Sequence, residues 1–200
     1  MAAVIEALHE EHRNIARLLT ALEHQIEIFA EGGQPDYDVV VGVADYFLDY
    51  PDRCHHPKED AIVERLRLAY PDETGAVADL MGEHVAVHER ALRFRQTVKD
   101  LLNDTDIPRA EIVDSARRFI EFQWRHMRKE EMTFLPLADL LLGPDDWRAI
   151  EAKLSARTDP VFGGRVVAMF KTLSERLLAW EAEDEQEVFR ARRHESRGDG

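Results

Sequence analysis

The sequence predicts an all-α protein, an up-down-up-down four-helix bundle with additional C-terminal helices. Two observations indicate this fold. Glycine is scarce, with 10 in 200 residues, and apolar residues recur at helical spacing rather than at every second position. Turn residues interrupt this pattern so that four long amphipathic segments are joined by short connections. A bundle buries the apolar faces of such segments most simply.

The first two helices of the bundle are delimited by glycine and proline. One face of the first helix is marked by Leu8, Ile15, Leu19, Leu22 and Ile26. This helix runs to about Ala30, and the Gly-Gly-Gln-Pro break at 32–35 ends it. The second helix is expected from about 36 to 69. Pro51 and Pro57 each remove a backbone donor and crowd a carbonyl, which predicts one bent helix with a kink near 49–53.

The third and fourth helices complete the predicted bundle domain, residues 1–142. The third is expected from about 73 to 102, after Tyr70-Pro71 closes the second. Turn residues at 103–108 then lead into a fourth helix that runs to about 135, where Pro136 should kink or stop it.

The remaining chain is expected to form a helical extension packed on the bundle, residues 143–189. A fifth helix should run to about Ala156, and a loop at 158–164 should precede a sixth helix from 165 to about 187. Residues 190–200 have no apolar pattern and are expected to be a disordered tail.

Charge and composition exclude several classes of protein. The chain has 26 Lys and Arg against 40 Asp and Glu, a formal net charge of −14, whereas nucleic-acid binding needs a basic surface. No stretch reaches the roughly 18 apolar residues of a membrane span, and Glu6 is unlike the start of a signal peptide. A single cysteine, Cys54, cannot form an internal disulfide. We therefore expect a cytoplasmic protein with neither membrane nor nucleic acid as a partner.

Histidines and glutamates on the inward stripes of the four helices are the strongest functional signal. They are His12, His55 with Glu59, His84 with His88, and His126 with Glu130. The three pairs share a spacing of four residues, which puts both members on one helix face. Burying seven such groups would be very costly unless a cation joined them. Seven ligands exceed what one ion accepts, so the pattern predicts two metal ions, and the mixture of imidazole and carboxylate suits iron.

An internal repeat supports the same site. Residues 55–60 and 126–131 align as His-x-x-Lys-Glu-acid, while Glu11-His12 aligns with Glu83-His84. Two equivalent helical hairpins would build a pseudo-twofold site. The alignment makes His55 the counterpart of His126. His56 with Asp60 stays open as a second-ranked alternative, because it is expected to face the side of Arg67 rather than Leu66.

These motifs resemble the hemerythrin-like HHE cation-binding family, over about Ile5–Leu137, and specifically its bacterial HHE branch. The resemblance implies a four-helix bundle with a non-haem di-iron centre, bridged by two carboxylates and an oxygen atom. It implies as ligands His12, His55, Glu59, His84, His88, His126 and Glu130. The invertebrate oxygen carriers of the family have an Asp five residues after the last-helix histidine, whereas this chain has Glu130 four residues after His126. The segment after Gly143 also lies outside the resemblance.

The expected function is reversible binding of dioxygen or a related small molecule for storage, sensing or delivery. The first alternative is an enzyme that reduces nitric oxide or decomposes peroxide, with Glu11, Glu83 and Glu131 near enough to the ligands to feed protons. The second is an iron-responsive regulatory module. Because no acid–base pair stands apart from the ligands, a binding protein is favoured over an enzyme. A protein partner or a homodimer stays open. The stripe of Phe119, Phe122, Phe134 and Leu137 is interpreted as core, and a role as a dioxygen pocket stays open beside it.

Overall fold

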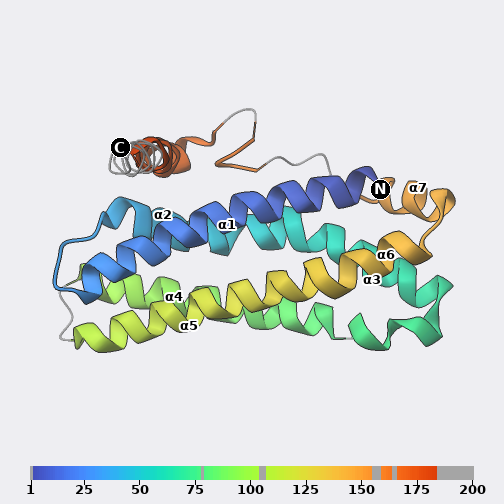
Figure 1. Cartoon of the computed structure of the whole chain (residues 1–200), viewed down its shortest axis with the longest axis horizontal. Coiled ribbons are helices and arrows are strands. Elements are labelled where there is room, and N and C mark those ends of the chain that lie inside the picture. The colour runs from blue at the N-terminus through green and yellow to red at the C-terminus, as the bar shows by residue number, and fades with distance from the viewer. Residues whose placement is uncertain (1, 78, 104–106, 155–158, 164–165, 184–200) are drawn as a thin grey trace, which may run out of the picture.

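The computed structural model describes residues 2–77, 79–103, 107–154, 159–163 and 166–183. Within these ranges the protein is all-helical, and Figure 1 shows long helices lying side by side as a bundle. The predicted fold class is confirmed. No helix in these ranges is long and apolar enough to cross a membrane.

The first two long helices follow the prediction closely. Helix α1 spans Ala3–Ala30 and is followed closely by Gly32, whose φ of 93° is one that glycine adopts readily. Helix α2 spans Tyr37–Tyr50, with the Asp36 side chain accepting a hydrogen bond from the Asp38 amide. It passes without a break through a π-helical turn, η1 (Pro51–His55), into α3 (His56–Ala69).

The π-helical turn η1 lies where the sequence predicts a kink. Pro51 has no amide hydrogen to donate to the carbonyl four residues earlier. The His56 amide instead donates to the Pro51 carbonyl, five residues back, which is π-helical pairing. The chain therefore accommodates Pro51 by widening locally and continues as helix into α3.

The third helix begins later than its predicted start near residue 73. Residues Pro71–Val77 form a 3₁₀ segment, η2, and α4 spans Leu80–Leu102. The Thr74 hydroxyl donates to the Pro71 carbonyl at 2.9 Å, which stabilises the tighter turn next to Gly75.

The fourth helix continues past Pro136. Helix α5 spans Arg109–Lys129, a second π-helical turn η3 covers Glu130–Phe134, and α6 spans Leu135–Leu141. Pro136 stands in the first turn of α6, as Pro57 stands in the first turn of α3. Each of these prolines is the second residue after a π turn, and the helix is not stopped there.

The C-terminal extension is shorter in helix than predicted. Helix α7 spans Pro144–Glu151, and a 3₁₀ turn, η4 (Ala168–Phe170), precedes a helix from 171 to 183, so the predicted start at 165 was too early. Figure 1 shows this last helix beside α2. Asp159 anchors the connection by accepting a hydrogen bond of 2.8 Å from the Tyr46 hydroxyl. The predicted tail at 190–200 lies outside the described residues.

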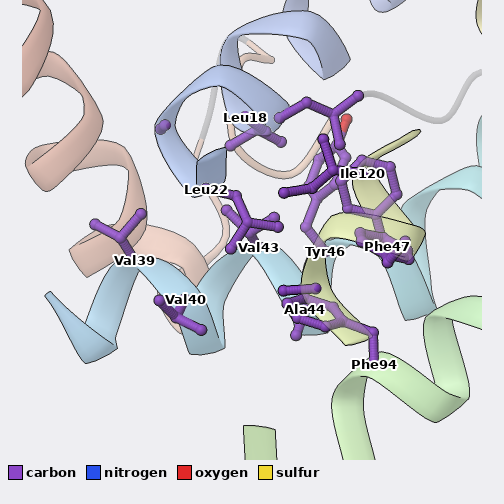
Figure 2. Packing of buried hydrophobic residues seen from close by; sticks show 14 of the residues in the cluster. Leu18, Leu22, Val39, Val40, Val43, Ala44, Tyr46, Phe47, Phe94 and Ile120 are labelled. Carbon is purple, nitrogen blue, oxygen red and sulfur yellow. The ribbon is translucent and has the colours of Figure 1, made fainter. Parts of the chain in front are cut away.

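Two apolar clusters make up the core. The larger cluster joins α1, α2, α4, α5 and the C-terminal helix, and Figure 2 shows part of it, around Val43 and Phe47 of α2. The smaller joins the start of α1, α3, α6 and α7, and includes Phe134 and Trp147. Phe122, predicted as core, is only partly buried. Along each long helix the two clusters are separated by buried polar residues.

Candidate metal centre

Seven buried side chains from all four bundle helices form the polar layer between the two clusters. They are His12 of α1, His55 of η1, His56 and Glu59 of α3, His84 of α4, His126 of α5 and Glu130 of η3. Their potential ligand atoms fall into two groups, and within each group these atoms lie within 4.8 Å of one another. One group is His56, His84 and His126. The other is His12, His55, Glu59 and Glu130.

The Glu59 carboxylate faces both groups. Its Oε2 lies 3.6 Å from His55 Nε2 in one group and 3.3 Å from His84 Nε2 in the other. Its Oε1 lies 3.8 Å from His12 Nε2. Glu59 is fully buried, so its charge has no water to solvate it and depends on these neighbours.

The Glu130 carboxylate occupies an equivalent position. Its Oε2 lies 3.4 Å from His12 Nε2, while its Oε1 lies 2.9 Å from His126 Nε2 and 3.6 Å from His84 Nε2. Both carboxylates therefore stand where a ligand shared between two cations would stand.

Every imidazole of the layer has a carboxylate partner on its outer nitrogen. The Nδ1 atoms of His12, His55, His56, His84 and His126 lie 2.6 to 3.3 Å from Glu131, Glu11, Asp52, Asp60 and Glu83, respectively. A hydrogen bond from Nδ1–H to a carboxylate fixes the tautomer and leaves the Nε2 lone pair facing the centre. The histidines are thus oriented as metal ligands are.

The internal repeat of the sequence is visible in these contacts. Glu11 accepts from both His55 and Lys58, and Glu83 makes the matching contacts with His126 and Lys129. The adjacent acids cross over: Asp60 pairs with His84, and Glu131 with His12. The two hairpins therefore support one another's histidines.

His56 breaks this symmetry, because its counterpart in the second half is Met127. His56 is 5% exposed, and its ring stacks on that of His84 at a centroid distance of 4.1 Å. In an α-helix, neighbouring residues cannot both face the core squarely. Here η1 ends at His55 and α3 begins at His56. The π turn rotates the inward-facing side of the helix after it relative to the side before it, so both histidines are buried.

His88 is the one predicted ligand that lies outside both groups. Its side chain is 40% exposed and its Nδ1 pairs with Asp52, the carboxylate that also holds His56. His88 therefore stands behind His56, as seen from the centre. The structure brings together the other six predicted residues and adds His56. The sequence signal for His56 was the His-His pair before Pro57, which the repeat alignment ranked second.

Several inward atoms have no hydrogen-bond partner among the described residues. They are both Glu59 oxygens, Glu130 Oε1, and the Nε2 atoms of His84 and His126. Native proteins rarely leave such buried atoms unsatisfied. A set of imidazole nitrogens and carboxylate oxygens, aimed at one another and short of partners, fits a metal site.

Charge within the layer leads to the same conclusion. Burial raises the pKa of Glu59 and Glu130, but the surrounding imidazoles outweigh burial and hold both pKa values below the usual range. Burial lowers the pKa of His12 and His84, but hydrogen bonds to carboxylates outweigh it and raise these values to about 10 and about 11. Without a metal, protons on histidine supply the positive charge that the carboxylates require.

His56 differs from its neighbours in this respect. Burial lowers its pKa to about 4 despite the contact with Asp52. A neutral imidazole can bind a cation without first losing a proton, so His56 is ready to serve as a ligand at neutral pH.

A small cavity adjoins the layer on the side of the larger cluster. Its volume is about 10 Å³, and its apolar wall includes Ile15, Phe47 and Met127. Gln123 also lines it, is 5% exposed, and has a side-chain nitrogen with no hydrogen-bond partner among the described residues. Sequence reasoning did not single out Gln123, which occupies the place of Asp52 in the repeat.

Comparison with known proteins agrees with this geometry. The search of curated proteins and the search of solved structures found no match. The model of the hemerythrin HHE cation-binding domain matches residues 3–138, which include every residue of the polar layer. The chain therefore belongs to the hemerythrin HHE cation-binding family.

Proposed function

We propose that the protein holds two iron ions and uses them to bind dioxygen or a molecule of similar size. His56, His84 and His126 would hold one ion, His12 and His55 the other, and Glu59 and Glu130 would be shared. The separation of the donors into two groups, with both carboxylates facing each group, supports two ions rather than one. The nitrogen and oxygen donors suit iron. When bound, the ions would supply an open coordination position and reversible redox chemistry.

The unequal number of histidines indicates where that position would be. The repeat gives each half one His-x-x-x-Glu motif and one lone histidine, and His56 is the additional donor in one group. The group of His12 and His55 thus has one histidine fewer than the group of His56, His84 and His126. An incomplete ligand set is what a site needs if it is to take an external molecule.

The cavity beside the layer is the observation that carries the proposal. At about 10 Å³ it has room for about one water molecule, so it suits a diatomic ligand far better than a larger substrate. The walls formed by Ile15, Phe47 and Met127 would exclude further water and limit proton access. The free amide N–H of Gln123 is the donor available to a molecule placed there.

One observation favours the enzyme as a second candidate. Glu131 is 33% exposed and joins His12 to the partly exposed His9, with its Oε1 at 2.6 Å from His12 Nδ1 and 3.0 Å from His9 Nδ1. His9, Glu131 and His12 therefore form a hydrogen-bonded path from the surface to the group of His12 and His55. Reduction of nitric oxide or breakdown of peroxide would need such a proton supply.

The test is anaerobic reconstitution with ferrous iron, followed by metal counting and exposure in turn to dioxygen, nitric oxide and peroxide. We expect about two irons per chain and reversible or slowly autoxidising oxygen binding. Glu130→Ala should abolish both. Glu64→Ala, on the exposed face of α3, is the matched control and should change neither.

Two results would contradict the proposal. Saturation at a single ion under these conditions would exclude the two-iron centre. Sustained turnover of nitric oxide or peroxide at about 1 per second or faster, lost in Glu130→Ala, would favour the enzyme over the binding protein.

A further inference from the structure

A second set of charged side chains lies in a groove between α4 and α5, and no residue of the polar layer lines it. The groove has a volume of about 170 Å³ and is lined by Arg90, Arg93, Phe94, Ser115, Arg118 and Phe119. Three arginines around one hollow are unexpected in a chain with a net charge of −14. We refer to this hollow as the arginine groove.

The antiparallel register of the two helices builds the arginine groove. At one end the Thr97 and Ser115 hydroxyl oxygens lie 3.0 Å apart across the seam. At the other end the Arg90 guanidinium lies over the Phe122 ring, 4.1 Å from its centroid. The stacked rings of Phe94 and Phe119 lie between the helices, with centroids 4.6 Å apart. The floor is therefore rigid and aromatic, while the rim carries hydroxyl and guanidinium donors.

The arginines have little compensating negative charge. Among the described residues, Arg93 pairs only with Glu89, at 3.3 Å and with both side chains exposed. No ion pair is found there for Arg90 or Arg118. Arg90 Nε is buried and has no hydrogen-bond partner among these residues. A buried, unsatisfied donor on a charged group is costly, and like charges gathered in a groove repel one another.

We propose that the arginine groove binds a phosphoryl group. Guanidinium groups donate paired, charge-assisted hydrogen bonds whose spacing matches the oxygens of a tetrahedral anion. Arg90, Arg93 and Arg118 approach the groove from two helices, and Ser115 adds a hydroxyl. Whole small-molecule sites usually occupy about 300 Å³ or more, so the groove accommodates the phosphoryl group itself. The remainder of a phosphate ester would lie in solvent.

The bound species is either free inorganic phosphate or the phosphate of a nucleotide. Both present the same chemistry to the groove, and direct titration distinguishes them. Inorganic phosphate, AMP and ATP are titrated separately into the full-length, iron-loaded protein by calorimetry in a phosphate-free buffer of about 0.15 M ionic strength, at which long-range attraction is screened. Equal affinities would assign the site to the phosphate alone, and tighter binding of a nucleotide would assign it to the ester.

Three variants separate specific binding from general attraction. Arg118→Ala should weaken binding at least about tenfold, the loss expected for a hydrogen bond to a charged group. Arg90→Lys keeps the charge but removes the planar donor pair, and should weaken binding by a similar factor. The matched control is Arg117→Ala, because this neighbour lines a different hollow, with Glu23 and Glu27. It should change the dissociation constant less than about twofold, since only long-range, salt-screened attraction is altered.

Iron can also bind phosphate, so the metal centre needs its own control. Glu130→Ala should leave phosphate affinity within about twofold, because the arginine groove does not use the ions. Absence of saturable phosphate binding would overturn the proposal. Equal losses in Arg117→Ala and Arg118→Ala, or loss of binding in Glu130→Ala, would overturn it as well.

Discussion

Replacing His56 by alanine should remove one of the two proposed ions, and replacing His88 should not. Within the group of His56, His84 and His126, His56 is stacked on His84 at 4.1 Å and buried to 95%. Its loss leaves two nitrogens on that side of the shared carboxylates. Asp52 contacts both His88 and, at 3.1 Å, the Nδ1 atom of His56. His88→Ala removes only the first of these contacts and should leave the contact with His56 in place.

The magnitudes follow from these positions. Loss of a group that only orients a ligand typically weakens metal binding about 10-fold to 100-fold. Loss of a ligand should reach at least the upper limit of this range, about 2.7 kcal/mol. His88→Ala should lie near the lower limit or below it, because Asp52 keeps its position. The two variants should thus differ by about tenfold or more in the affinity of the weaker site.

The assay is titration of ferrous iron into each metal-free variant under anaerobic conditions, with metal counting after gel filtration. We expect His56→Ala to retain about one ion and His88→Ala about two. Circular dichroism of both variants shows whether the bundle is intact. Loss of an ion in His88→Ala together with two ions in His56→Ala would refute this reasoning and restore the ligand set predicted from the sequence.

Three other predictions test different parts of the structure. Gly42→Ala would place a Cβ 2.9 Å from Leu173 Cβ, and this overpacking should cost about 1–3 kcal/mol of unfolding free energy, measured in urea, despite the better helix propensity of alanine; an increase would contradict it. Because the pKa values of His12 and His84 are raised to about 10 and about 11, both are protonated at pH 7 without metal. The pKa of His126 is raised as well, so ion binding should release at least about two protons per chain and strengthen as pH rises. A binding enthalpy independent of the buffer's ionisation enthalpy would argue against this. Gln123→Leu should leave the ion count unchanged but speed the dissociation of bound dioxygen about tenfold, the effect of one lost hydrogen bond. Stopped-flow measurements give this rate, and an unchanged rate would show that the amide does not contact the bound dioxygen.

Helical periodicity was sufficient to predict the bundle and most of the polar layer. His12, His84 and His126 lie on apolar stripes of uninterrupted helix, so their inward direction follows from spacing alone. Glu59 and Glu130 follow from the spacing of four to a histidine. The family resemblance drew on the same residues, and the matching family model confirmed it.

The position of His56 could not be predicted from spacing. The prolines indicated a disturbance near residue 51, but they did not indicate that the helix would widen and continue. An α-helical projection across η1 turns His56 away from the core, whereas the real turn brings it inward. In the sequence, His88 was instead predicted as a ligand, because it lies four residues after His84 on the same helix face.

The contacts around the layer depended on tertiary structure in a similar way. The sequence showed that Glu11, Glu83 and Glu131 lie beside predicted ligands, but each supports a histidine of a different helix. Such pairing depends on how far the helices are shifted relative to one another along the bundle axis. The proposed role of Gln123 likewise depends on a cavity whose lining comes from α1, α2, η1, α3, α5 and η3.

The separation of the apolar core into two clusters has a consequence for how the protein folds. Residues from Ile15 onward in α1 belong to one cluster and residues up to Leu8 to the other, and the same division occurs along the other long helices. Between the two clusters lies the polar layer, so hydrophobic contacts do not run continuously from one end of the bundle to the other. Cations in that layer would cross-link all four helices at mid-height and make the two ends a single cooperative unit. Metal-free chains would then have two folding units of different stability, and the degree of metal loading would determine how readily a protease cleaves the less stable one.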